Sequence, residues 1–294
     1  MFSTFEKKIQ TMTRILVPVD FTKSSLASFV YAAHLADSIK AEITVIHVIN
    51  GSFSTADSMF LDTMDASYEA ANQRLSKFVK ERTPEGISLD KIAIKKEVRF
   101  GVPGFTIADF ANDQAFDYVI SGMRDNHSLI EKFLGTTSSI ITKLTSCPVL
   151  LIHENTRWSE PKKVIFTIDD STDFDESITA YLKFNHHFKA VTDFLHIKKD
   201  DTEIDSTRDT VIREVFKIKE PDFAFEINNI NGGDVIQSIV DYSIFEKADM
   251  LVMVHRKRKL LDSVFNRSMS LKTAEGIHLP IMILEENPPA EITP

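Results

Sequence analysis

The chain repeats itself, and this internal repetition constrains its fold more than any other feature of the sequence. Four residues recur at a constant offset of 149 positions: Asp20, Lys40, Ala41 and His47 return as Asp169, Lys189, Ala190 and His196. Four more recur at a constant offset of 132: Gly101, Asp117, Phe133 and Pro148 return as Gly233, Asp249, Phe265 and Pro280. The difference of 17 residues predicts a shorter connection in the second copy, between its second strand and its third helix. The sequence is therefore interpreted as a tandem duplication of one domain.

Within the first copy, short apolar runs alternate with stretches of helical periodicity. The runs predict strands at Arg14–Asp20, Ile43–Ile49, Ile92–Val98, Asp117–Ser121 and Pro148–Ile152. The periodic stretches predict helices at Lys23–Lys40, at Ala56–Arg82, from Gly101–Gly104 through Ala115, and onward from Ser138. This alternation favours an α/β fold, in which parallel strands are joined by right-handed crossovers and helices cover both faces of the sheet.

The predicted domain boundaries follow from a polar segment, 154–161, which ends in Trp-Ser-Glu-Pro and is interpreted as a linker. It separates a first domain, 1–153, from a second, 162–294. A length of 294 residues with 43% hydrophobic and 26% charged residues is typical of about two globular domains.

Composition also narrows the expected partners and location. The formal net charge of −9 argues against binding to nucleic acid or to an anionic membrane. The single cysteine, Cys147, excludes an internal disulfide framework and favours a reducing compartment. No apolar run approaches the roughly 20 residues that span a bilayer, and Met1–Thr13 lacks the apolar core of a signal peptide. We therefore expect a cytoplasmic protein.

One loop carries a pattern that can hold an anion. The fourth predicted strand leads into Gly122, and Gly135, Thr136 and Thr137 lead into the next predicted helix. Glycine allows a phosphate to approach the backbone closely, hydroxyl groups add donors, and a helix N-terminus offers free N–H groups. The spacing is that of a G-x2-G-x9-G-[ST] motif, except that Asp125 stands at the second glycine.

Several segments together resemble the universal stress protein family. In the first half these are ILVPVDFTKSS, IHVI, FDYVISG and TSCPVLLI; in the second half they are KKVIFTIDDS, ADMLVMVHRKRKLLDSVFNRS and LPIMIL. The resemblance implies two tandem doubly wound domains, each a five-stranded parallel sheet of order 3-2-1-4-5, with ligand at the carboxyl ends of the strands. It also implies an internal pseudo-dimer in which Val149–Leu151 pairs antiparallel with Ile281–Ile283. Tandem chains of this kind could pair further as homodimers.

The same resemblance implies an ATP site in the first half, with Mg2+ bridging the phosphates. Its expected residues are Asp20 on the ribose and phosphate side, Val48 against adenine through its backbone, and Gly122, Gly135, Thr136 and Thr137 in the phosphate loop. Each residue also has a purely structural interpretation. Asp20 could cap the following helix, Val48 could be a core residue, Gly135 could open a helix, and the two threonines could cap it.

The second half departs from this pattern. Val254, Lys257 and Arg267 stand where Gly122, Asp125 and Gly135 stand in the first half, so we expect no nucleotide there. The basic run 255–259 is either a solvated rim or a site for a phosphate or an acidic partner. In the first half, the negative charge of Asp125 predicts weak metal-free binding that Mg2+ improves.

The sequence lacks several common catalytic motifs. It has no Walker A lysine loop, no HExxH, no paired cysteines and no G-x-S-x-G elbow. His47 and His196 occupy repeated strand positions, which favours packing or hydrogen bonding over catalysis. We therefore expect no enzyme, with ATP hydrolysis slow and incidental at most. Two functions remain open: an ATP-binding protein of stress-response signalling, and a ligand-free interaction module.

Overall fold

The chain forms two consecutive α/β halves in a computed structural model that describes residues 12–51, 58–87, 92–123, 131–168, 174–198, 207–255 and 278–285. The first half contains β1 (Arg14–Pro18), α1 (Lys23–Ile39), β2 (Glu42–Ile49), α2 (Ser58–Arg82), β3 (Ile94–Phe100), α3 (Pro103–Asp113), β4 (Tyr118–Met123), α4 (Glu131–Leu144) and β5 (Val149–His153). The second contains β6 (Lys163–Ile168), α5 (Phe174–Asn185), β7 (Val191–Lys198), α6 (Thr207–Lys219), β8 (Phe225–Asn231), α7 (Val235–Phe245), β9 (Met250–His255) and β10 (Ile281–Glu285).

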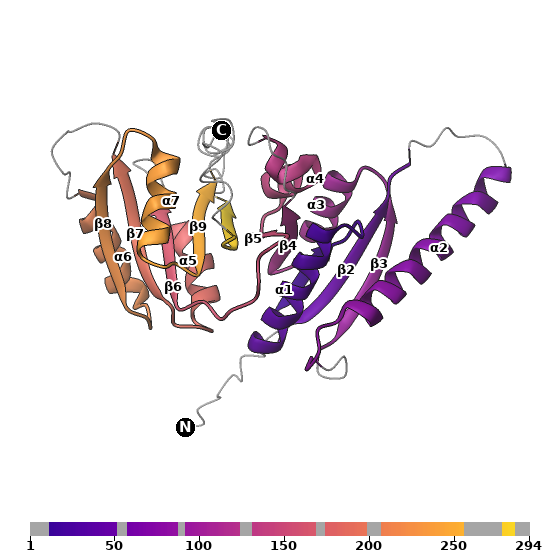
Figure 1. The fold of residues 1–294 in the computed structure, drawn as a ribbon, viewed down its shortest axis with the longest axis horizontal. Coiled ribbons are helices and arrows are strands. Elements are labelled where there is room, and N and C mark those ends of the chain that lie inside the picture. The colour runs from indigo at the N-terminus through magenta and orange to yellow at the C-terminus, as the bar shows by residue number, and fades with distance from the viewer. Residues whose placement is uncertain are drawn as a thin grey trace, which may run out of the picture.

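All ten described strands belong to one sheet, whose order is β3-β2-β1-β4-β5-β10-β9-β6-β7-β8 (Figure 1). Each half therefore has the order 3-2-1-4-5, and strands within a half pair in parallel. The two halves meet where β5 and β10 pair antiparallel, with Leu151 opposite Ile281 and Val149 opposite Ile283. This register confirms the predicted pairing, and it covers two strand edges that would otherwise expose unpaired backbone groups.

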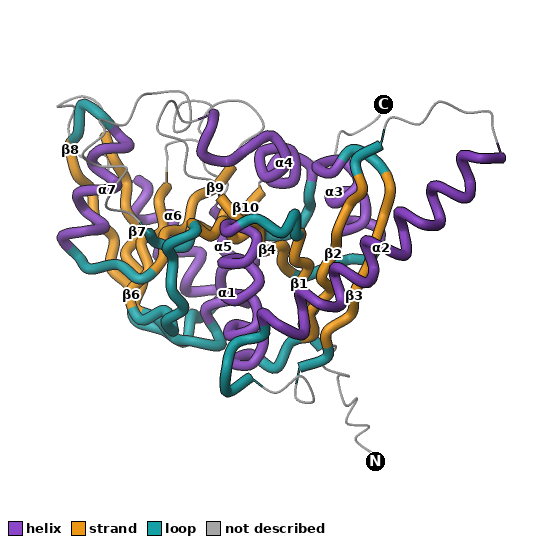
Figure 2. The backbone as a smooth tube through the Cα atoms, turned by 45° about the vertical axis from the view of Figure 1, so that its right-hand side comes forward, coloured by secondary structure: helices purple, strands orange, loops and turns teal. Residues whose placement is uncertain are grey.

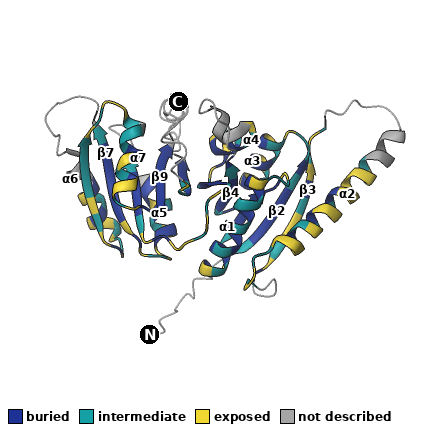
Figure 3. Cartoon of the chain, in the orientation of Figure 1, coloured by how far each residue is buried: buried dark blue, intermediate teal, exposed yellow. Residues whose placement is uncertain are grey.

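Helices cover both faces of the sheet, as the alternating strand residues require (Figures 2 and 3). On β1, Ile15 and Val17 point to one face and Leu16 points to the other. The first face packs against α1, α2, α5 and α6, and the second packs against α3, α4 and α7. Each core runs through both halves, so apolar burial continues across the joint between β5 and β10.

The duplication is visible in equivalent backbone contacts. Asp117 accepts a hydrogen bond from the backbone N–H of Arg14 at 2.8 Å, and Asp249 accepts one from that of Lys163 at 2.9 Å. Lys40 and Lys189 both adopt left-handed backbone conformations, with φ of 58° and 53°. The repeated aspartates thus hold the start of the first strand in each half.

Unequal helix lengths explain much of the difference between the two offsets. The second helix spans 25 residues in the first half, as α2, but its counterpart α6 spans 13 residues. The shorter connection predicted for the second copy therefore lies in this crossover. Among the described residues, no helix has both the length and the apolar character that a bilayer crossing requires.

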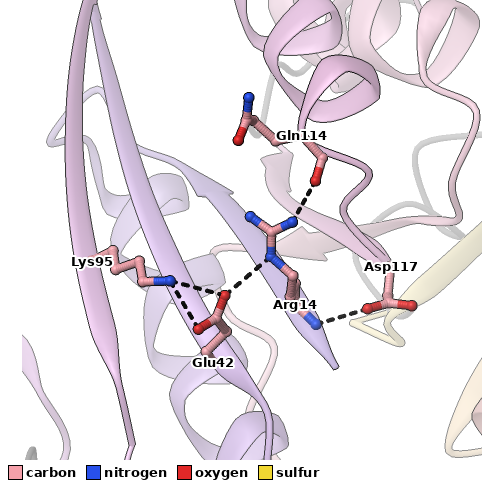
Figure 4. Close-up of polar contacts among 5 residues, drawn as sticks. All are labelled: Arg14, Glu42, Lys95, Gln114 and Asp117. Carbon is pink, nitrogen blue, oxygen red and sulfur yellow. Dashed lines mark hydrogen bonds and ion pairs between the residues drawn. The ribbon is translucent and has the colours of Figure 1, made fainter. Parts of the chain in front are cut away.

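At the amino ends of the first-half strands, a polar network ties three strands together (Figure 4). Glu42 accepts hydrogen bonds from Arg14 Nε at 3.0 Å and from Lys95 Nζ at 3.0 Å. Arg14 also donates to the backbone oxygen of Gln114. Burial alone would raise the pKa of Glu42, but the hydrogen bonds and charges of Lys95 and Arg14 outweigh it and lower that pKa.

Candidate functional site

A cavity of about 360 Å³ opens at the carboxyl ends of β1, β2 and β4 in the first half. In this sheet the strand order reverses between β1 and β4, and ligands of open α/β sheets bind outside the strand ends at such a point. Five of the six predicted site residues line the cavity: Asp20, Val48, Gly122, Thr136 and Thr137. The sixth, Gly135, precedes Thr136 within α4.

The turn from β1 into α1 supplies the acidic wall of the cavity. Asp20 accepts hydrogen bonds from the backbone N–H of Thr22 at 3.1 Å and from the Thr22 hydroxyl at 2.5 Å. Thr22, not Asp20, is the N-cap of α1, and its hydroxyl accepts a bond from the N–H of Ser25. The interpretation of Asp20 as a helix cap is therefore wrong. Asp20 orients the cap residue and faces the cavity.

Gly122 forms the back of the cavity where β4 passes the start of α1. A Cβ at this position would lie 2.4 Å from the backbone oxygen of Ser24, so only glycine allows the two elements to approach this closely. Gly122 also remains within β4, paired with Ile152, whereas the sequence predicted that the strand ends at Ser121. The strand extends because β5 provides a partner along this length.

The helix start differs from the prediction in a way that changes the expected chemistry. The sequence predicted a helix that begins beyond Gly135, with free N–H groups at Gly135–Thr137, but α4 begins at Glu131. Only the first four N–H groups of a helix lack an internal partner, so those of Gly135–Thr137 belong to the helical ladder. The sequence 131–134, Glu-Lys-Phe-Leu, contains residues of good or moderate helix propensity, which permits the earlier start. In this arrangement Thr136 and Thr137 line the cavity from within the helix.

Serine hydroxyls reinforce the same wall. Ser121 and Ser138 are buried, and their hydroxyl oxygens lie 3.0 Å apart. Ser138 Oγ also donates to the backbone oxygen of Gly122 at 3.0 Å, which fixes α4 to the end of β4. Sequence reasoning did not select these serines, nor Ser24 and Ser25, which also line the cavity. The hydroxyl cluster that follows Asp20 in the sequence was a signal that could have found the last two.

The second strand contributes Val48 and His47. Val48 is 8% exposed, so it is both a core residue and part of the cavity wall. The Nδ1 atom of His47 lies 2.8 Å from the backbone oxygen of Val19, which agrees with the predicted hydrogen-bonding role. His47 also lines the cavity, a position that the sequence did not predict.

Several predicted features lie outside the described residues: Asp125, Asp169, Lys257 and Arg267, with most of the basic run 255–259. In the second half, Val254 is 5% exposed and occupies the position equivalent to Gly122. Within the described residues, no group of three or more histidine, cysteine, aspartate or glutamate side chains could hold a metal ion.

Comparison with known proteins identifies the first half. Residues 11–153 match the model of the universal stress protein family. These residues form a universal stress protein domain. Universal stress protein YxiE of Bacillus subtilis is 25% identical over 150 residues, which cover 48% of this chain and 98% of that protein. Universal stress protein Mb2028c of Mycobacterium bovis is 26% identical over 143 residues, and here the chain spans only 48% of the relative's length.

The whole chain has the fold of a tandem universal stress protein. The crystal structure of a universal stress protein from Archaeoglobus fulgidus superposes with a TM-score of 0.66 and covers 92% of this chain and 96% of its own. At 16% identity this likeness concerns the fold. It extends over both halves, and the sheet order in each half is the one that the family resemblance implied. The predicted family and fold class are thus confirmed.

Proposed function

We propose that the first universal stress protein domain binds one adenine nucleotide, as ATP with Mg2+, and that binding serves stress-response signalling without turnover. The observation that carries the proposal is the cavity at the strand ends, which brings together Asp20, Val48, Gly122, Thr136 and Thr137 from three separate elements and one turn. These positions are distant in the sequence, and they meet at the topological switch point where this fold takes ligands.

The charge of the cavity supports a dependence on Mg2+. Among the described lining residues none is a lysine or an arginine, and Asp20 adds a negative charge. Hydroxyl groups can donate hydrogen bonds to phosphates, but they cannot neutralise them. A divalent cation bound with the nucleotide would supply that neutralisation. We therefore expect metal-free ATP to bind more weakly than its Mg2+ complex.

The absence of turnover is part of the proposal. Of the titratable side chains on the described lining, Asp20 is held by Thr22, and His47 Nδ1 faces the backbone oxygen of Val19. These contacts give both side chains structural roles, and the sequence carries none of the hydrolase motifs considered above. We expect a steady-state phosphate-release assay to give no sustained turnover with Mg2+ and ATP. Phosphate release in proportion to active protein, at many turnovers per hour, would refute this part.

Titration calorimetry with Mg2+ and ATP tests the binding itself. One nucleotide should bind per chain, and Asp20→Asn should weaken binding roughly tenfold, because the carboxylate orients the β1–α1 turn. The matched control is Asp169→Asn, the equivalent change in the second half, which should leave the affinity unchanged. Two sites per chain, or equal effects of the two substitutions, would contradict a site confined to the first half.

A second function, a ligand-free interaction module, draws support from the position of Gly135–Thr137 inside α4, where their N–H groups are engaged. Mass spectrometry of small molecules released from gently purified protein separates the two functions. Recovery of an adenine nucleotide supports the binding protein. Its absence, together with no heat of binding, supports the interaction module.

A further inference from the structure

A second cavity, of about 420 Å³, lies between the start of α1 and the C-terminal part of α2. It shares no lining residue with the nucleotide cavity, although the two meet at the β1–α1 turn, where Asp20 of the first accepts a hydrogen bond from Thr22 of the second. We propose that this α1–α2 groove binds a small organic anion that carries an aromatic or aliphatic body, such as an aromatic carboxylate or sulfonate. The proposal goes beyond nucleotide binding and concerns a separate ligand.

The apolar part of the groove can hold such a body. Phe21, Leu26 and Phe78 line it, and the rings of Phe21 and Phe78 meet edge to face with centroids 5.6 Å apart. Both rings are partly buried and pack against the main core, so the groove has a firm apolar floor. Ligand pockets in proteins are mostly apolar, with a few polar groups that fix orientation.

The rim of the groove is positively charged, although the chain as a whole is negatively charged. Four cations line the groove against one acid: Lys23, Arg74, Lys77 and Arg82 face Glu81. The chain as a whole carries a formal net charge of −9, so this concentration of positive charge is a local feature. Lys77 pairs with Glu81 at 3.9 Å, but among the described residues no acid pairs with Arg74 or Arg82. Their guanidinium groups remain available for a planar carboxylate or sulfonate.

Phe21 contacts both a cation of the rim, Arg74, and the apolar floor of the groove. The guanidinium of Arg74 lies 4.0 Å from the centroid of the Phe21 ring, a cation–π geometry that holds it over the groove. Phe21 has a φ of 64°, a conformation that a bulky residue rarely adopts. Such backbone strain persists where surrounding contacts require it, and it is common at ligand-binding positions. An aromatic anion could stack on these rings while its charged group meets Arg74 and Arg82.

Titration with 1-anilinonaphthalene-8-sulfonate, followed by its fluorescence, tests the proposal on the full chain without nucleotide. The double variant R74Q/R82Q should weaken binding roughly tenfold through loss of charge. Phe78→Ala should weaken it roughly fivefold through loss of apolar surface. The matched control is Lys80→Gln, which removes a positive charge from the same helix outside the groove and should leave the affinity unchanged. Far-UV circular dichroism of each variant checks that α2 stays folded.

The chemistry of the ligand is tested with two further probes. The uncharged N-phenyl-1-naphthylamine and inorganic phosphate should each bind at least about tenfold more weakly than the sulfonate. The first lacks the anionic group, and the second lacks the apolar body. The proposal is overturned if R74Q/R82Q binds the sulfonate as tightly as the unchanged chain, if Lys80→Gln weakens it equally, or if binding does not saturate. Phosphate that binds as well as the sulfonate would also overturn it.

Discussion

At the scale of single residues, Glu42 shows how one carboxylate joins three strands. It receives hydrogen bonds from Arg14 on β1 and from Lys95 on β3, and its own side chain is 14% exposed. Acidic residues also directly precede β4 and β9, at Asp117 and Asp249, and nothing in the local sequence predicts the different partners of Glu42. Its role depends on two cations that are 28 and 53 positions away in the chain.

This network predicts a pH dependence with a definite sign. The pKa of Glu42 is lower in the folded chain than its ordinary value, so its contribution to stability is full above the unfolded pKa, near about 4.3, and is lost as pH falls through the folded pKa. In Glu42→Gln, unfolding midpoints in urea should fall less steeply between about pH 5 and pH 3 than in the unchanged chain. Glu69→Gln, an exposed change on α2, is the control. Parallel profiles for all three proteins would mean that Glu42 is not coupled to folding.

At the scale of the secondary elements, α4 decides how the proposed nucleotide site works. Its start at Glu131 places Gly135 in the second turn, where Thr136 and Thr137 line the cavity while their N–H groups belong to the hydrogen-bond ladder of the helix. A helix that began beyond Gly135 would present those N–H groups instead. The two arrangements differ in how Gly135 affects the stability of the fold, because glycine destabilises the interior of a helix but is well suited to a loop.

Gly135→Ala separates these two arrangements. With Gly135 inside α4, alanine should stabilise the ligand-free protein by about 0.5–1 kcal/mol, measured by thermal unfolding. The same change should weaken ATP binding in calorimetry, because the added methyl group takes space beside Thr136. Ser139→Ala, one turn further along α4, is a control that should raise stability without changing ATP affinity. A loss of stability in Gly135→Ala would show that Gly135 requires a non-helical conformation.

At the scale of the whole molecule, the two halves behave as one sheet with continuous cores on both faces. The linker adds a further contact between them through Trp158, the only tryptophan in the chain. Its ring lies 4.9 Å from that of Tyr31 in the first half and 6.4 Å from that of Phe188 in the second, measured between centroids. Lys183 of α5 also pairs with Asp117 of the first half. These contacts favour cooperative unfolding of both halves.

Trp158→Ala should reduce this cooperativity. In the unchanged chain, urea unfolding followed by tryptophan fluorescence and by far-UV circular dichroism should give coincident transitions. The variant should lose about 1–3 kcal/mol and broaden or split into two calorimetric transitions. Phe245→Ala, which removes a 79% exposed ring from the end of α7, is the control and should unfold as the unchanged chain does. A variant that keeps one sharp transition at the original midpoint would show that the linker does not couple the halves.

The sequence by itself determined the duplication and the alternation of strands and helices, which follow from local periodicity and from residues that recur along the chain. The resemblance to a family implied that Val149–Leu151 pairs antiparallel with Ile281–Ile283, and the structure gave the register of that pairing. The predicted ATP site, its Mg2+ and the absence of turnover stay predictions, although five of the six predicted residues share one cavity.

Only the tertiary structure decided where elements from distant parts of the chain approach one another. The contact of Gly122 with the backbone of Ser24, the convergence of Ser121 and Ser138, and the groove between α1 and α2 are contacts across many intervening residues. The start of α4 is also of this kind, because local propensity permits more than one helix boundary and packing selects among them. These contacts depend on how the helices pack against the sheet, and the spacing of residues along the chain does not specify that packing directly.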